Sequence, residues 1–573
     1  MTGSTTSPRR ATPATSAPAP APAPGARVMG WRPTEYDLIG IVVGLSFVWW
    51  SLSPSLLPRG PMLQAGVSGV VGAVGYGLGR VLGEVVRRSA RRDPSPRWMR
   101  RAWQVVAIGG PLVTVGLLAV TARQQLRLYR LLEQPPPPRI GYLATLPVAL
   151  LVAVVLIELA RSVRRLARWL TDRLDAHLAR GVAKTISVVV VAVLVIGLLD
   201  GVVARAFFAG ADGFARTIDQ AISPDLEPPS SPLRSGGPGS AVAWDRLGAK
   251  GREFVAEGPS IVDLVATSNR PVQDPIRVYV GLTAAADDRG RAELAVAELE
   301  RTGAFARSVL LVTVPTGTGW INPRPIDALE YLHAGDTAVV AVQYSYLPSW
   351  LSFLVDAVRA EESARELVNA VHVRWEELPE DQRPLLLVYG ESLGAYGAEA
   401  SFSGVADLRN RTDGALFIGP PNFGPLWRGF VEQREPGSPE RRPIYDEGRT
   451  VRFAASAADL EVPHPPWEPP RVVYLQQASD PVVWWSPRLL LRRPDWLQEP
   501  RAPDVLTDVH WFPVVTFVQI TVDLLNGYAI DLDGYGHRYG GVILDAWLAI
   551  APPPGWDDGD RAGIEEALGF DRD

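Results

Sequence analysis

The sequence contains no cysteine among its 573 residues. Disulfide bonds, thiolate nucleophiles and cysteine-ligated zinc are therefore excluded. Histidine is almost as scarce, and no two histidines show the HExxH spacing of a helical zinc site. The six are His177, His333, His372, His464, His510 and His537. We therefore expect no metal centre and no cofactor.

Charge is unevenly distributed along the chain. There are 57 basic and 62 acidic residues, for a formal net charge of -5, yet arginines crowd the first third and carboxylates dominate the rest. Such asymmetry is typical of proteins that contact a membrane or a nucleic acid. Here the basic clusters lie in short connectors between long apolar runs, which indicates a membrane and no nucleic-acid partner.

Five apolar runs in the first third each approach the length of about 20 residues that a membrane-spanning helix needs. They cover Tyr36–Leu57, Met62–Leu82, Ala102–Ala122, Ile140–Ala160 and Thr185–Phe208. We predict a transmembrane helical domain of about five spans over residues 33–210. Residues 1–32 form a Pro/Ala-rich tail that we expect to be disordered. The tail lacks the apolar centre and cleavage site of a signal peptide.

The connectors between these runs predict how the chain crosses the membrane. The tail and the second and fourth connectors hold most of the arginines, whereas the first and third hold few. Because basic connectors stay in the cytoplasm, the amino terminus is expected there and everything after Phe208 outside. Glycines repeated from Gly66 to Gly79 predict close helix packing, within the bundle or in a dimer. Asp200 is a candidate functional acid inside the fifth run, unless Arg205 simply pairs with it.

The remaining residues form a linker and a second domain. The segment Ser223–Ala241 is rich in Pro, Ser and Gly, which predicts a linker over residues 211–245. Residues 246–573 alternate between strand-forming and helix-forming segments, which is typical of a mostly parallel sheet with helices on both faces. The predicted strands are Ile276–Leu282, Val309–Val314, Thr337–Tyr344, Leu385–Tyr389 and Arg471–Ala478.

The fourth of these strands runs directly into Gly390-Glu391-Ser392-Leu393-Gly394, a GxSxG sequence. At a strand-to-helix junction this pattern exposes a serine hydroxyl on a tight turn, and the glycines let the neighbouring strand and helix approach. We predict that Ser392 is a nucleophile. An ordinary structural turn is the alternative.

A nucleophilic serine needs a base and an acid, which follow it in the order acid, histidine in this type of fold. Asp480 comes at the end of a predicted strand and is the preferred acid, with Asp504, Asp508, Asp531 and Asp533 as alternatives. His537 lies in the glycine-rich segment DGYGHRYG and is the preferred base. His510, at the entry to an apolar helix, is the alternative.

The oxyanion of an acyl-transfer intermediate must be met by backbone N–H groups. One comes from the residue after the nucleophile, here Leu393. The segment PTGTGW follows the strand Val309–Val314 and is the candidate for the second donor. The alternative is that this segment is an ordinary glycine turn. Its candidate residues are Thr316, Gly317, Thr318 and Gly319.

Five segments carry a resemblance to a known family: PTGTGW, QYSYLPSW, GESLGAYG, ASDPVVWW and GYGHRYG. Behind about five spans, they resemble a family of bacterial, chiefly actinobacterial, membrane-anchored alpha/beta-hydrolases. The resemblance implies an alpha/beta-hydrolase fold with the serine, acid and histidine roles on Ser392, Asp480 and His537. Two features depart from the wider fold: the oxyanion loop has no His-Gly-Gly, and Trp511–Tyr528 looks helical where an eighth strand would precede the histidine.

Such a site forms an acyl-enzyme that water or another acceptor resolves. The expected substrate is an ester, with membrane lipid the natural candidate, because the domain is expected beside a membrane and is rich in tryptophan. Our first hypothesis is a serine esterase or lipase at the outer face of the membrane. The alternatives are an acyltransferase with the same triad and a non-catalytic scaffold or transport-associated protein.

Overall fold

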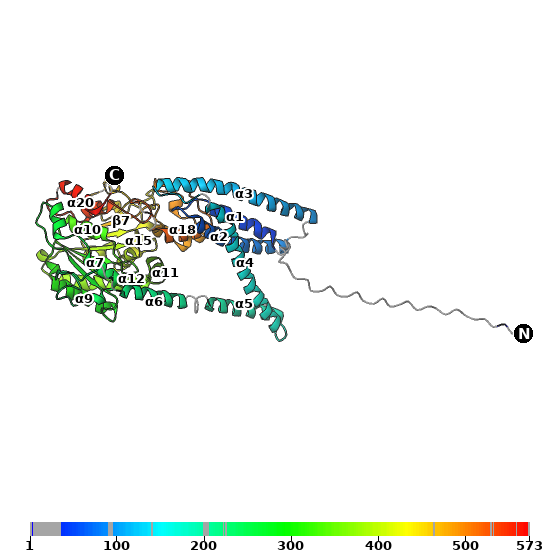
Figure 1. Cartoon of the computed structure of the whole chain (residues 1–573), viewed down its shortest axis with the longest axis horizontal. Helices are drawn as coiled ribbons and strands as arrows, with labels where there is room; N and C mark the ends of the chain where they lie inside the picture. The colour runs from blue at the N-terminus through cyan, green and yellow to red at the C-terminus, as the bar shows by residue number, and fades with distance from the viewer. Residues whose placement is uncertain are drawn as a thin grey trace.

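The computed structural model describes residues 3, 36–89, 95–138, 141–198, 205–221, 223, 226–461, 465–527, 530, 532–556 and 558–570. It consists of an amino-terminal group of long helices and a carboxyl-terminal α/β part (Figure 1). Asp200, His464, Asp531 and most of the Pro/Ala-rich tail lie outside the described residues.

The α/β part is built on one sheet of seven parallel strands in the order β1-β3-β2-β4-β5-β7-β6. Almost every strand residue is buried, as expected for a sheet covered on both faces. The strands are β1 (Ile276–Val280), β2 (Val309–Val314), β3 (Thr337–Val342), β4 (Leu385–Glu391), β5 (Gly414–Ile418), β6 (Val451–Ala454) and β7 (Arg471–Leu475).

Helices cover both faces of this sheet, which confirms the predicted layering (Figure 1). One layer holds α9 (Asp288–Thr302), α12 (Ala357–Glu376) and α13 (Leu393–Glu399), and the other holds α10 (Pro323–Leu332), α19 (Val542–Ile550) and α20 (Arg561–Leu568). The other helices are α7 (Gly248–Ala256), α8 (Ile261–Thr267), α11 (Ser349–Val355), α14 (Val405–Arg411), α15 (Pro425–Glu432), α16 (Ala457–Leu460), α17 (Pro481–Trp484) and α18 (Val515–Asn526).

The five predicted strands all form, and the sheet adds two that the sequence did not indicate, β5 and β6. The predicted helix over Trp511–Tyr528 is confirmed as α18. Among the described residues, no strand lies between β7 and His537; β6 pairs with β7 and fills the last position of the sheet.

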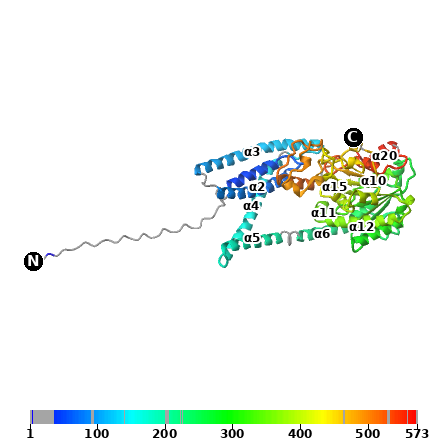
Figure 2. The ribbon, with the colours of Figure 1, turned by 180° about the vertical axis from the view of Figure 1, so that it is seen from behind.

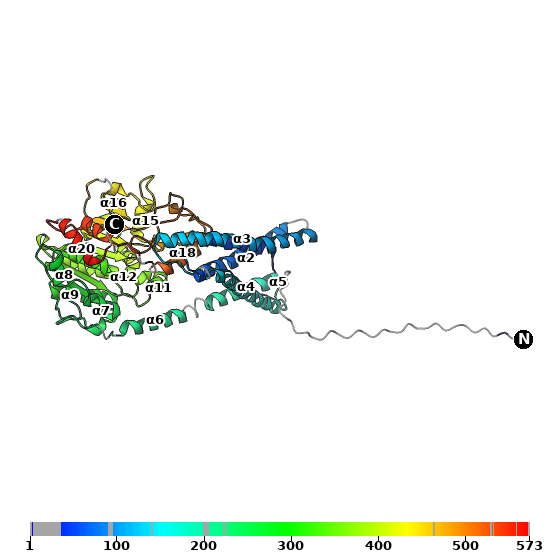
Figure 3. The same cartoon turned by 45° about the horizontal axis from the view of Figure 1, so that its top comes forward.

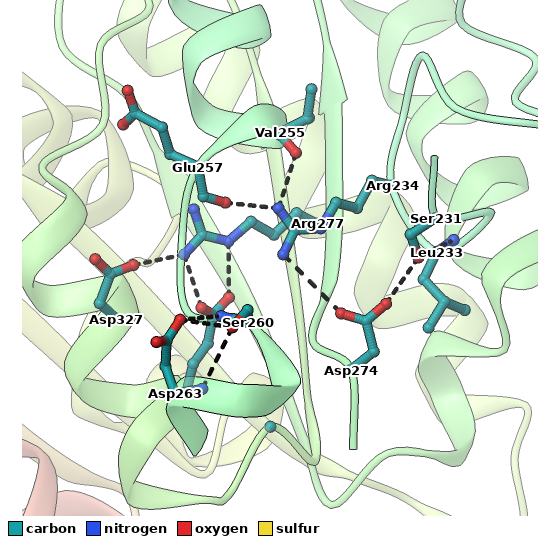
Figure 4. A network of polar contacts seen from close by, with 12 residues as sticks. Ser231, Leu233, Arg234, Val255, Glu257, Ser260, Asp263, Asp274, Arg277 and Asp327 are labelled. Carbon is teal, nitrogen blue, oxygen red and sulfur yellow. Dashed lines mark hydrogen bonds and ion pairs between the residues drawn. The ribbon is translucent and has the colours of Figure 1, made fainter. Parts of the chain in front are cut away.

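A buried charge network holds the β1 edge of the sheet (Figure 4). Arg277 of β1 is 1% exposed and donates to Glu330 at 2.9 and 2.7 Å and to Asp327 at 2.5 Å. Beside it, Arg234 donates to the carbonyl oxygens of Val255 and Glu257. A buried guanidinium needs such partners, because one without them would cost several kcal/mol. The segment around Arg234 is thereby fastened to the sheet.

The amino-terminal helices are α1 (Leu38–Ser51), α2 (Pro61–Ser89), α3 (Pro96–Leu131), α4 (Gly141–Leu174), α5 (Arg180–Ile196) and α6 (Arg205–Gln220). Three helices within the described residues are long and apolar enough to cross a membrane: Pro61–Ser89, Pro96–Leu131 and Ala144–Leu174. They correspond to the second, third and fourth predicted spans.

The first and fifth predicted spans differ from expectation. The helix α1 has 14 residues, about 21 Å at the α-helical rise, which is short of a hydrocarbon core of about 30 Å. It ends at Ser51 because Pro54 and Pro58 follow and the chain folds back into α2. In the fifth predicted span, Thr185–Phe208, helix α5 ends at Ile196, and residues 199–204 lie outside the described part of the chain.

The predicted close packing of the glycine-rich second span is confirmed within the bundle. A Cβ built on Gly75 would lie 2.7 Å from the Phe47 ring of α1, and one on Gly69 would lie 2.7 Å from the Ala149 oxygen of α4. Any side chain at these positions would push the helices apart.

The α1–α2 hairpin docks on the α/β part through its connecting loop, residues 52–60, and helix α18. Asp523 of α18 accepts hydrogen bonds from the Ser55 hydroxyl at 2.9 Å and the Leu56 amide at 3.1 Å. Phe512, just before α18, stacks on Trp50 of α1 with ring centroids 5.3 Å apart. From the other side, α5 leads back to α6, which meets the α/β part (Figure 2, Figure 3).

Candidate active site

Ser392 sits on the turn between β4 and α13, as predicted. Its backbone has φ 56° and ψ -124°, a conformation that a residue with a side chain adopts only under strain. The residue is 4% exposed. Such a turn directs the side chain out of the strand and helix that flank it, which is the property a nucleophile requires.

The two flanking glycines are required by close packing. A Cβ on Gly390 would lie 2.5 Å from the carbonyl group of Gly394, and one on Gly394 would lie 2.2 Å from the Val314 oxygen at the end of β2. The first turn of α13 therefore packs directly against β4 and β2. This packing holds Ser392 beside the PTGTGW loop, which begins at Pro315.

His537 and Asp480, the preferred base and acid, lie together. The distance from His537 Nδ1 to Asp480 Oδ2 is 2.7 Å, and both side chains are fully buried. The carboxylate also accepts from the Tyr539 hydroxyl at 2.7 Å and from the Val482 amide at 2.8 Å. The carboxylate is thus held by three donors once Nδ1 carries the proton, and that tautomer leaves Nε2 as a possible base.

The histidine ring lies next to the Ser392 turn. The Ser392 amide donates to Ile418 at 2.9 Å, and Gly419 follows at φ 53°. A Cβ on Gly419 would lie 2.4 Å from His537 Cε1, so glycine is needed for the ring to fit. The other ring nitrogen, Nε2, lies 3.8 Å from an oxygen of Glu391, the residue immediately before Ser392.

Burial and charge oppose each other at this ring. Burial lowers the pKa of His537, but the charge and hydrogen bond of Asp480, with the charge of Glu391, outweigh it and raise the pKa. For Glu391, in contrast, burial raises the pKa of the carboxyl group. Its other oxygen accepts hydrogen bonds from the Asn322 side-chain amide at 2.8 Å and from the Tyr389 hydroxyl at 3.0 Å. The protonated form of His537 is therefore more stable in this site than it would be in water.

The PTGTGW loop forms a tight turn beside α13. The Thr316 amide donates to the Trp320 carbonyl at 2.9 Å, and the Gly319 amide donates to the Thr316 carbonyl at 2.8 Å. Within the described residues, the amides of Gly317 and Thr318 donate to no backbone carbonyl. Of the four predicted oxyanion residues in this loop, these two have amides left for a ligand. The Leu393 amide opens α13, where no carbonyl of the same helix can accept it.

Two neighbours fix the position of this loop. A Cβ on Gly317 would lie 2.3 Å from the Ser352 hydroxyl of α11, so α11 covers the loop closely. On the opposite side, Gln343 Nε2 lies within hydrogen-bond distance of the Thr318 carbonyl, at 3.2 Å, and of Asp219 of α6, at 3.1 Å. The end of the amino-terminal helical part thus reaches the candidate oxyanion loop.

The alternative acids and base lie elsewhere. Asp504 accepts from the Ser479 amide, Asp508 from the Gln124 side chain, and Asp533 forms an ion pair with Arg324. His510 is exposed. Only Asp480 among the described candidates meets a histidine.

Three residues of the site escaped the sequence reasoning. Glu391 and Tyr539 lie inside the GESLG and GYGHRYG segments, and their spacing from Ser392 and His537 was the available signal. Gly419 follows β5, a strand that the sequence did not indicate, and no motif includes it.

A row of aromatic rings runs from α13 toward the amino-terminal helices. Its contacts join Tyr396 to Phe423, Phe423 to Phe353, Phe353 to Trp485 and Trp485 to Phe517 of α18, with centroids 5.1 to 5.8 Å apart. Tyr396 is four residues after Ser392. The row provides an apolar surface suited to an acyl chain.

No cluster of three or more histidine, aspartate or glutamate side chains that could hold a metal ion occurs in the described part of the chain.

The chain belongs to the alpha/beta-hydrolase family. Residues 276–564 match the alpha/beta-hydrolase family, and residues 52–259 match the N-terminal region described for that family. The second match includes the three membrane-crossing candidates and the α1–α2 loop. Neither the curated proteins nor the solved structures contain a match to the chain.

Proposed function

We propose that the chain is a membrane-anchored serine hydrolase that cleaves carboxylic esters through Ser392, His537 and Asp480. The observation that carries the proposal is the buried His537–Asp480 pair, placed against Gly419 beside the strained turn of Ser392. A hydrolase family and a site with these three residue types point to the same chemistry.

The reaction proceeds through an acyl-enzyme. The Ser392 oxygen attacks the ester carbonyl carbon while its proton passes to Nε2 of His537. The carbonyl C–O bond to the alcohol then breaks, and the alcohol leaves with that proton. Water, activated by the same nitrogen, attacks the acyl-enzyme and releases the acid. Asp480 holds the ring by accepting from Nδ1 and stabilises the imidazolium.

The developing oxyanion is met by backbone amides. Leu393 supplies one donor, and Gly317 or Thr318 supplies the second, since both lie on the loop packed against α13. One such donor is typically worth about 100-fold or more in kcat. The arrangement needs no His-Gly-Gly sequence, because any amide at this place can serve.

The substrate we propose is an ester of a membrane lipid, met at the outer face of the membrane. The hairpin loop and α18 join the site to helices that are apolar enough to span a bilayer. The arginine-rich ends of α2 and α4 and the arginine-rich start of α3 lie at the far end of the bundle from the α/β part, whereas the last turn of α3, with Arg130, lies beside it (Figure 1). Basic ends favour the cytoplasm, so the arginines of α2, α4 and the start of α3 support an extracytoplasmic hydrolase domain.

Labelling with a fluorophosphonate tests the nucleophile. The full-length protein in detergent is expected to react, and Ser392→Ala is expected to remove the label. Ser401→Ala, a buried serine of the α13–α14 connection, is the matched control and should label normally. An unlabelled wild type, or a labelled Ser392→Ala, would contradict the proposal. Products formed from a lipid ester with and without an alcohol acceptor then distinguish hydrolysis from acyl transfer.

A further inference from the structure

A cavity with a volume of about 480 Å³ lies between the segment after β5 and the segment after Asp480. Trp427, Trp484 and Trp496 form its apolar walls. Five arginines line it, namely Arg428, Arg434, Arg488, Arg492 and Arg493, against the three carboxylates of Glu432, Glu440 and Asp495. The lining is therefore positively charged even with every carboxylate ionised.

Two of these arginines are already bonded within the protein. Arg434 pairs with Asp495 at 2.8 Å, and Arg493 donates to the Leu497 carbonyl. In contrast, the guanidinium groups of Arg428, Arg488 and Arg492 make no hydrogen bond or ion pair with any residue that the structure describes. Three cations with unused donors around one cavity are suited to an anion with several oxygen atoms.

The cavity is connected to the catalytic region on one side. Phe423, in its lining, belongs to the aromatic row that reaches Tyr396 of α13. Trp484, also in its lining, ends the short helix α17 that begins directly after Asp480. A ligand with its anion among the arginines could therefore extend apolar groups along the row toward the Ser392 turn.

On the other side, the segment that carries Arg488 and Arg492 contacts the segment that docks on the hairpin. The Leu490 carbonyl accepts from the Val514 amide at 2.9 Å, and Phe512, two residues before Val514, stacks on Trp50 of α1. Between Arg488 and Arg492, Leu491 is 79% exposed. An exposed leucine flanked by arginines, beside helices that can span a bilayer, fits a surface in contact with anionic lipid.

We propose that this cavity binds the phosphate head group of an anionic phospholipid. If the proposed function holds, the same lipid class is the substrate. It is held so that an acyl chain lies along the aromatic row and its ester approaches Ser392. The phosphate oxygens take the unused donors of Arg428, Arg488 and Arg492, and Leu491 enters the acyl region of the bilayer.

Binding can be tested separately from catalysis in the full-length Ser392→Ala protein in uncharged detergent. Calorimetric titrations would use dihexanoyl phosphatidylglycerol, dihexanoyl phosphatidylcholine and inorganic phosphate. We expect the phosphatidylglycerol to bind at least about tenfold more tightly than the other two ligands, because phosphatidylcholine lacks the net negative charge and inorganic phosphate lacks the acyl chains. Adding Arg488→Gln and Arg492→Gln should weaken its binding by about tenfold or more.

A matched control uses Arg246→Gln and Arg289→Gln, which remove two exposed arginines outside the cavity lining and should leave binding unchanged. Equal binding of the two lipids, binding of phosphate as tight as that of phosphatidylglycerol, or no effect of the cavity variants would overturn the inference. Circular dichroism checks that the variants are folded.

Turnover of the protein with Ser392 intact separates the two proposals. If the wild type hydrolyses neutral and anionic lipids equally and the cavity variants change neither rate, the serine hydrolase stands and the lipid assignment fails. If phosphatidylglycerol binds as expected but no ester is cleaved and no fluorophosphonate label forms, the head-group site stands and the proposed function fails.

Discussion

The α1–α2 hairpin and helix α4 are both apolar and helical, yet they meet the rest of the molecule differently. Helix α3 is intermediate, because its end reaches the α/β core through Leu128 and Leu132 while its middle is exposed. The hairpin loop is buried in the α/β part: Leu56 and Leu57 are 1% and 0% exposed and belong to its core. By contrast, only 6% of the most apolar 18-residue stretch of α4 is buried. Leu150 and Leu151 of α4 are exposed, as are Ile108 and Leu112 of α3.

This difference shows that apolar composition alone does not define a helix's role. The hairpin loop carries polar groups with specific partners: Gln519 of α18 donates to the Ser51 and Ser53 carbonyls, and Asn526 donates to Pro58. The side chain of Leu57 also lies over the histidine loop, since a Cβ on Gly536 would be 3.5 Å from it. The exposed apolar surface of α3 and α4 is the kind that lipid covers.

Truncating Leu57 should produce the largest effect that separates the two regions. Leu57→Ala is expected to lower the free energy of unfolding by about 3 kcal/mol, because a fully buried leucine leaves a cavity. Leu151→Ala on α4, whose side chain is exposed, should change it by less than about 0.5 kcal/mol. Denaturation in detergent micelles, followed by tryptophan fluorescence, measures both. Equal losses would show that the hairpin loop is not part of the core.

The polar side of the docking surface should contribute somewhat less. Asp523→Ala leaves the Ser55 hydroxyl and Leu56 amide without their acceptor in a buried place, at a cost of about 2 kcal/mol. Asp508→Ala removes a solvent-exposed contact with Gln124 of α3 and should cost less than about 0.5 kcal/mol. The same denaturation assay compares them, and a harmless Asp523→Ala would argue against a specific docking site.

A smaller change should affect catalysis without undocking the hairpin. Tyr539→Phe removes the hydroxyl that donates to Asp480 at 2.7 Å, so the carboxylate holds His537 less firmly. We expect kcat to fall by roughly tenfold, equivalent to about 1.4 kcal/mol, with KM nearly unchanged. Ester hydrolysis kinetics provide the measurement. A change confined to KM would place Tyr539 in substrate binding.

The smallest change concerns the pH dependence of activity, because the carboxylates that raise the pKa of His537, Asp480 and Glu391, both belong to the α/β part. Glu391 contributes to the raised pKa of His537, and the base must be neutral to act. Activity should fall as pH drops through that pKa. Glu391→Gln lowers the pKa, so the acid limb of kcat/KM moves to lower pH, whereas Leu151→Ala on α4 leaves the limb in place. An unmoved limb in Glu391→Gln would exclude this role.

Local patterns were sufficient for much of the fold. The strands β1 to β4 and β7 are runs of apolar and β-branched residues, and the Ser392 turn follows from GxSxG at a strand end. In contrast, β5 begins with Gly414 and Ala415, and β6 has four residues with Arg452 among them, so neither is a run of large apolar and β-branched residues. The first span was overestimated for a related reason: hydropathy continues through Leu57, but the helix stops at Ser51, and the loop serves the core of another part of the chain.

The candidate site was predicted less completely than the fold. Order along the chain and glycine content favoured Asp480 and His537, and the structure brings these two together. The contribution of Gly419, Tyr539 and Glu391 to the ring's surroundings could not be read from spacing, because it depends on how β4, β5 and the His537 loop pack.

By itself, the sequence determined the alternation of strands and helices, the serine turn and the stretches of chain apolar enough for a membrane. These depend on periodicity and composition over 5 to 30 residues, which act locally. Tertiary structure alone decided which acid meets which histidine, that α18 receives the α1–α2 loop, and that three arginines with no partner among the described residues surround one cavity. Such contacts join residues distant in the chain, and their energy exists only once the elements between them are packed.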